Sequence, residues 1–88
     1  MIELKKAYEI ALDDAKKQYA NVEVLSCTDI GDRFAFAIGA NNEPLIGAPS
    51  FAVDKESGDL TYLSIPPIEN LKLLKNGTKI DIAFCKQA

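Results

Sequence analysis

The stretch from residue 33 to residue 40, RFAFAIGA, constrains the fold most strongly because its side chains alternate in size. One set is bulky (Phe34, Phe36 and Ile38), and the set between is Arg33, Ala35 and Ala37. A period of two is the pattern of a β-strand, whose successive side chains point to opposite faces of a sheet. We therefore predict a strand whose bulky face packs on a second layer, while its small-residue face stays open or lightly covered.

The N-terminal segment supplies that second layer. Its apolar side chains recur at intervals of three and four residues, which is the period of an amphipathic helix: Leu4, Tyr8, Ala11, Leu12, Ala15 and Tyr19. Asn21 is a plausible end for this helix, since asparagine tolerates the left-handed backbone conformation that follows many helices. We expect the helix to cover the bulky face of the sheet.

The rest of the chain predicts further strands and one short helix. Strand patterns occur in NVEVLSCT (residues 21–28), SFAVD (50–54), DLTYLSI (59–65) and TKIDIAFC (78–85). Pro66-Pro67 suits a helix start, and Asn76-Gly77 suits its end. The predicted fold class is α+β in a single domain, residues 1–88. An N-terminal helix packs on a small, mainly antiparallel sheet of four to five strands, with a short helix before the last strand.

The segment FAVDKESGDLTYL, residues 51–63, holds the densest group of carboxylates. A calcium loop needs acids at its first, third and fifth positions, glycine at the sixth and glutamate at the twelfth. Starting from Asp54, the fifth position is Gly58 and the twelfth is Ile65, so the ligand set fails. We predict a plain hairpin in which Asp54 bonds turn amides and Gly58 supplies a positive φ.

The composition argues against catalysis. The chain has no histidine, which excludes histidine-based general bases, Cys-His and Ser-His dyads and nearly all zinc sites. No phosphate-binding glycine loop or nucleophile elbow is present. Cys27 and Cys85 are predicted to be reduced core residues, although spacing alone does not exclude a disulfide. We expect a non-catalytic protein with no cofactor and no metal.

Charge is distributed unevenly along the chain. Residues 21–69 carry eight acids against two bases, a net charge of −6, whereas residues 70–88 carry a net charge of +3. An acidic middle repels nucleic-acid phosphates and attracts a basic protein. Surface charge of this kind also serves solubility alone. The candidate partner-binding residues in this middle region are Asp29, Asp32, Arg33, Glu43 and Glu56.

The segment ANNEPLIGAP, residues 40–49, is predicted to be a long loop. Long loops are more often functional than short ones. Leu45 and Ile46 lie in its middle, and we include both among the candidate partner-binding residues. The alternative is that they tuck over the edge of the core.

The stretch PLIGAPSFAVDKESGDLTYL resembles small bacterial YrhB-type immunity proteins of polymorphic toxin systems. Their helix, strand hairpin and Gly/Pro-bearing loop precede a Val-Asp-Lys-x-x-Gly hairpin, which here is Val53 to Gly58. The resemblance implies an inhibitor that masks a toxin, with a basic toxin as the partner. The same hairpin resembles that of PepSY-like domains, which implies a regulatory or peptidase-inhibiting module instead.

Two further expectations complete the prediction. A homo-oligomer, for example a homodimer built by pairing an edge strand at residues 79–85, is a third possible role. The apolar runs are far shorter than the roughly 18 residues of a spanning helix, so no membrane contact is expected. The first residues carry charges throughout, unlike a secretory signal, and a cytoplasmic location is the default.

Overall fold

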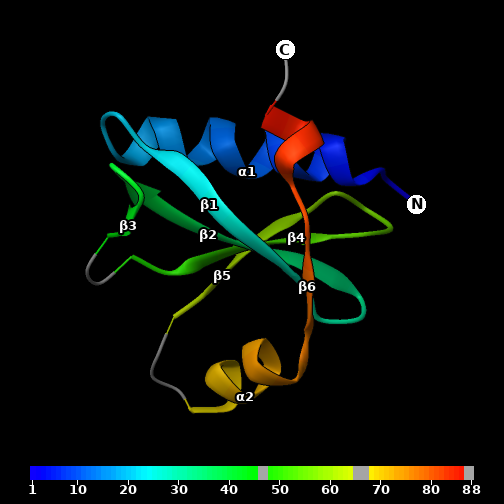
Figure 1. Cartoon of the computed structure of the whole chain (residues 1–88). Coiled ribbons are helices and arrows are strands. Elements are labelled where there is room, and N and C mark those ends of the chain that lie inside the picture. Colours follow the sequence, from blue (N-terminus) through cyan, green and yellow to red (C-terminus); the bar gives the residue numbers. More distant parts are fainter. Residues whose placement is uncertain (46–47, 65–67, 87–88) are drawn as a thin grey trace.

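The computed structural model describes residues 1–45, 48–64 and 68–86. It confirms the predicted α+β architecture, with an N-terminal helix packed on an open antiparallel sheet and a short second helix (Figure 1). The elements in chain order are α1 (Leu4–Gln18), β1 (Glu23–Asp29), β2 (Arg33–Ala40), β3 (Glu43–Pro44), β4 (Ser50–Asp54), β5 (Leu60–Leu63), α2 (Ile68–Asn76), β6 (Thr78–Ile80) and the 3-10 helix η1 (Ala83–Lys86).

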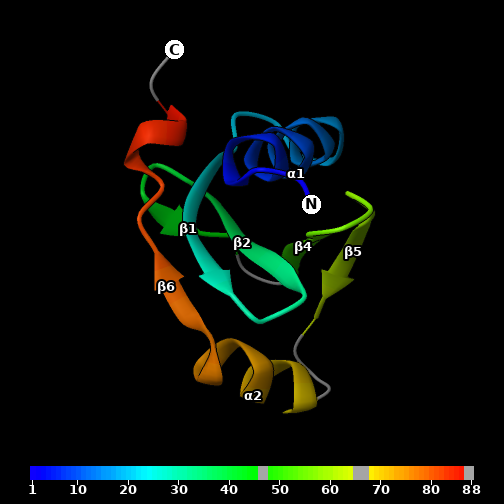
Figure 2. The ribbon, with the colours of Figure 1, turned by 90° about the vertical axis from the view of Figure 1, so that its right-hand side faces the viewer.

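The strands follow the order β5-β4-β2-β1-β6, and β3 pairs with the end of β2. All of these pairs are antiparallel. Helix α1 lies over one side of the sheet and α2 over the other (Figure 2). The chain passes through α2 from β5 at one edge of the sheet to β6 at the other. Strands β5 and β6 are thus the two edges of the sheet, and α1 and α2 lie on its two faces.

Helix α1 and the bulky face of the sheet form the main core, as predicted. Ala7, Ala11 and Ala15 are fully buried, and these small side chains let the helix approach the strands closely. Tyr8 meets Phe36 edge to face, with 6.2 Å between the ring centroids. The chain leaves the helix through Asn21, whose φ of 56° is the predicted left-handed conformation.

The predicted loop at residues 40–49 contains a sixth strand. Asn41 and Asn42 both adopt a positive φ and form a tight turn, which folds Glu43 and Pro44 back on the end of β2. Proline cannot donate a backbone hydrogen bond, so it favoured a loop in the sequence. Pro44 lies at the end of a two-residue strand, where the missing amide donor has little effect on stability. The sheet therefore has one strand more than the upper limit of the prediction.

The last predicted strand, residues 78–85, is only partly correct. Strand β6 ends at Ile80, and residues 83–86 form η1. The Asp81 carboxylate accepts a hydrogen bond from the Ala83 amide at 2.9 Å, which begins the turn. The turn places Ile82 and Cys85 in the core beneath α1. Burial of both side chains against the helix replaces continued strand pairing.

The hairpin at residues 54–59 is confirmed as a turn between two strands. One oxygen of Asp54 accepts hydrogen bonds from the amides of Glu56 and Ser57, at 2.8 and 3.0 Å. These bonds hold the pKa of Asp54 below its usual value, because they favour the charged carboxylate. Gly58 has a φ of +78°, the conformation expected of it.

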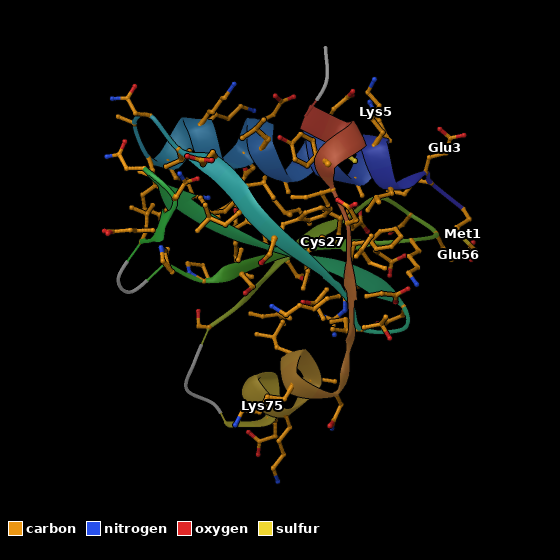
Figure 3. The ribbon with its side chains drawn as sticks, viewed as in Figure 1. Met1, Glu3, Lys5, Cys27, Glu56 and Lys75 are labelled. Atoms are coloured by element: carbon orange, nitrogen blue, oxygen red, sulfur yellow. The ribbon has the colours of Figure 1, made fainter. Side chains whose placement is uncertain are left out.

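Both cysteines are free thiols and both are buried in the core, as predicted. Cys27 lies on β1 near the centre of the molecule (Figure 3). Burial raises its pKa to about 12, since an apolar environment disfavours the thiolate. The pKa of Cys85 is raised mainly for the same reason. Neither thiol is therefore activated as a nucleophile.

None of the helices in the described part of the chain combines the length and apolar character that crossing a bilayer demands.

Candidate protein-binding site

Two hairpin turns meet at one end of the sheet. The Lys55 amide donates a hydrogen bond to the Asp32 carbonyl at 2.9 Å, which ties the β4–β5 turn to the β1–β2 turn. The Ile2 amide donates to the Lys55 carbonyl, so the N-terminus joins the same end. We call this region, residues 29–33 and 54–59, the acidic turn end. It gathers five carboxylates: Asp29, Asp32, Asp54, Glu56 and Asp59.

Lys55 is a largely buried, positively charged residue within the acidic turn end. Its Nζ lies 2.7 Å from an oxygen of Asp29 and 4.8 Å above the centroid of the Phe34 ring. The Lys55 side chain is only 15% exposed and that of Asp29 is 30% exposed. The hydrogen bond from Lys55, followed by one from the Gly31 amide, lowers the pKa of Asp29. Asp29 therefore serves to hold the two turns together.

Asp32 and Glu56 face outward instead. Asp32 lies 3.3 Å from the guanidinium of Arg33, yet its side chain is 72% exposed while that of Arg33 is 22% exposed. Glu56 is 78% exposed and lies 3.9 Å from the terminal ammonium group, and Figure 3 shows Met1 beside it. Exposed ion pairs of this kind contribute little to stability. Both carboxylates thus remain accessible to a partner.

The structure separates the other predicted residues from this group. Glu43 lies in β3, whereas the acidic turn end lies at the junctions of β1 with β2 and of β4 with β5. Leu45 is half-buried against the core, which supports the alternative that it tucks over the core edge. Ile46 lies outside the described residues. The seven candidates therefore do not form one patch: Asp29, Asp32, Arg33 and Glu56 come together, and Glu43 and Leu45 do not join them.

A pocket of about 650 Å³ beside the β1–β2 turn was not predicted. Its walls include Ile30 and Gly31 from the turn and Glu69, Lys72 and Leu73 from α2. Leu73 is 39% exposed, a large apolar side chain left partly in solvent. The sequence separates the turn from α2 by nearly 40 residues, so no local pattern signals their approach.

No group of three or more histidine, cysteine, aspartate or glutamate side chains is arranged to hold a metal within the part of the chain that the structure describes. Comparison of the chain with models of protein families, with curated proteins and with solved structures found no match. The site is accordingly defined by its geometry and charge: Lys55 and Arg33 are covered, Asp32 and Glu56 are exposed, and the exposed terminal ammonium group lies beside Glu56.

Proposed function

We propose that this protein is a non-catalytic binding module whose acidic turn end binds a basic surface of another protein. One observation carries the proposal. The two side-chain bases of this end are covered, whereas the carboxylates of Asp32, Glu56 and Asp59 are exposed. The exposed charge of opposite sign is the terminal ammonium group, 3.9 Å from Glu56. A partner therefore meets negative charge held on two tied hairpins. Charge complementarity of this kind speeds association and selects the partner.

The specific form of the proposal is an immunity-type inhibitor that masks a bacterial toxin in the cytoplasm. Two features support it. The Val53 to Gly58 hairpin, which carries the resemblance to YrhB-type immunity proteins, supplies Glu56 to the acidic turn end. A toxin that acts on nucleic acid needs a basic surface to approach phosphates, and such a surface matches exposed carboxylates.

Charge reversal at the acidic turn end tests the proposal. The protein, its Asp32→Lys/Glu56→Lys variant and a Glu43→Lys control are tagged and used to capture partners from the native host at low and high salt. We expect one basic protein on the wild type and the control. We expect its affinity for the double variant to be at least tenfold lower, about 1.4 kcal/mol. Equal capture by all three proteins refutes the proposal.

The identity of the captured partner then distinguishes an immunity protein from a PepSY-like peptidase inhibitor. A toxin whose activity falls when the wild-type protein is added supports the immunity role, and a protease inhibited in the same way supports a PepSY-like peptidase inhibitor.

A self-assembling protein is the second candidate function, because β6 lies at an edge of the sheet. Its three residues, Thr78–Ile80, leave a shorter edge than the predicted residues 79–85. Light scattering tests it directly: a dimer that Lys79→Pro converts to a monomer supports pairing through β6, since proline blocks strand pairing.

A further inference from the structure

The face of the sheet turned toward α2 is unusual in carrying small and hydroxyl side chains. Residues paired across an antiparallel sheet share a face. Thr28 pairs with Lys79 on one side and with Ala35 on the other, and Ala35 pairs with Ala52. One row across this face is therefore lysine, threonine, alanine and alanine. The next row holds Ser26 opposite Ala37.

This face is hollowed beneath α2. A pocket of about 340 Å³ lies there, at the lower end of the usual range for small-ligand sites. Its polar lining residues are three with hydroxyls, Ser26, Thr28 and Ser50, and two exposed lysines, Lys75 and Lys79. Leu74 of α2 packs against Ala35 and Ala52 of the sheet. The side chains of alanine and serine are short, which leaves space beside this contact.

Gly77 sets the distance between α2 and this face. A Cβ atom at Gly77 would collide with Cγ2 of Thr28 and would lie 2.8 Å from the carbonyl oxygen of Asp29. Only glycine allows the end of α2 to pass so close to β1. The close passage brings the last turn of the helix, with Leu74 and Lys75, to the rim of the pocket. Figure 3 shows Lys75 on α2, far from Glu56.

The pocket presents donors with no partner and carries net positive charge. Within residues 1–45, 48–64 and 68–86, neither Lys75 nor Lys79 forms an ion pair. The hydroxyls of Ser26, Thr28 and Ser50 likewise make no hydrogen bond among the described residues. No described carboxylate lines the pocket. This local charge is opposite in sign to the net charge of −3 on the whole chain.

We infer that this pocket binds a small phosphate monoester. A phosphate of this class carries a charge of about −1.5 to −2 near neutral pH, which two lysines balance. Its oxygens are strong acceptors for the three hydroxyls and the two ammonium groups. The apolar wall of Ala35, Ala37 and Leu74 contacts the short organic part of the ligand. The volume limits that part to a few carbon atoms.

Titration followed by backbone NMR shifts tests the inference at constant ionic strength. The probes are inorganic phosphate, glycerol 3-phosphate and uncharged glycerol. We expect saturable shifts at the amides of Ser26, Thr28 and Gly77 with glycerol 3-phosphate, a weaker response with inorganic phosphate and none with glycerol. A stronger response to inorganic phosphate assigns the site to the free ion and overturns the monoester.

Two double variants of equal charge provide the control. Lys75→Gln/Lys79→Gln removes the lysines of the pocket, whereas Lys16→Gln/Lys17→Gln removes two exposed lysines of α1. Loss of a charged hydrogen bond predicts roughly 10- to 100-fold weaker binding for the first variant and unchanged binding for the second. Thr28→Val, which preserves shape and charge, is expected to weaken binding by a smaller factor.

Equal weakening by both double variants refutes a defined site and indicates general attraction of anions. Absence of a saturable shift in the wild type also refutes it. All of the altered lysines are exposed, so loss of folding does not confuse the result. The pocket lies apart from Asp32 and Glu56, and the experiment is therefore independent of the partner-binding proposal.

Discussion

Replacing Lys55 with methionine isolates the internal ion pair of the acidic turn end. Methionine keeps an apolar stem over Phe34 and removes the ammonium group. The hydrogen bond to Asp29 is charge-assisted and largely covered, which makes it worth about 1–2 kcal/mol. The contact with the Phe34 ring adds about 0.5–1 kcal/mol. We therefore expect Lys55→Met to lower the free energy of unfolding by about 1.5–3 kcal/mol near pH 7.

The decrease in the free energy of unfolding caused by Lys55→Met should be larger at neutral pH than at acidic pH. Lys55 lowers the pKa of Asp29 in the folded protein, so the stability from this pair is fully present above the unfolded pKa, about 3.9. It is lost as the pH falls through the lower folded value. In Lys55→Met the largest cause of that low pKa is absent. The difference between the two proteins should therefore shrink below about pH 4, leaving the part due to the Phe34 contact.

Urea unfolding followed by circular dichroism measures this difference at neutral and at acidic pH. Asp29→Asn and the double variant complete a thermodynamic cycle, whose interaction energy should be about 1–2 kcal/mol near neutral pH. Lys17→Met, on the exposed side of α1, is the control and should change stability by less than about 0.5 kcal/mol. An equal loss at both pH values refutes the assigned role of Lys55.

Two further predictions concern glycine and cysteine. Gly39→Ala places a Cβ against the Glu43 carbonyl oxygen and should cost about 1–3 kcal/mol, with loss of hydrogen-exchange protection in β3. At Gly31 a Cβ would meet open space, but the φ of +105° makes Gly31→Ala cost about 1–2 kcal/mol through backbone strain. This variant should keep hydrogen-exchange protection in β3. Protection of β3 in both variants contradicts the steric argument. Cys27, with a pKa of about 12, should react with a thiol reagent only after unfolding. Rapid labelling of the native protein at Cys27 contradicts this, and Cys85 should be protected likewise.

The elements that could be predicted are those whose pattern is local. The alternation around Phe36 and the helical stripe through Tyr8 each identify one face, and the two faces meet at 6.2 Å between the rings. The Asp54 hairpin follows from turn chemistry within six residues. Each of these predictions needs only neighbouring residues, because periodicity and turn geometry are properties of a short segment.

The elements that could not be predicted depend on distant contacts. Residues 81–85 have a strand pattern, yet Ile82 and Cys85 are buried in the core that also contains the alanines of α1. β3 forms because two asparagines adopt the left-handed conformation together, which composition permits but does not require. Nothing in the sequence places α2 beneath Ser26 and Thr28, so both pockets were missed.

The net charge of a small chain does not say which charged side chains its folded surface exposes. The prediction of a basic partner rests on a segment with eight acids and two bases, and in the structure one of these acids, Asp29, is paired internally with Lys55. What matters is which charges are exposed, and at the acidic turn end these include the carboxylates of Asp32, Glu56 and Asp59 and the terminal ammonium group. In the smaller pocket on the α2 side of the sheet, the charged lining residues are Lys75 and Lys79. Strand alternation and the two hairpin turns thus place acidic side chains at one end of the sheet and lysines beside one of its faces, and the two proposals rest on this separation.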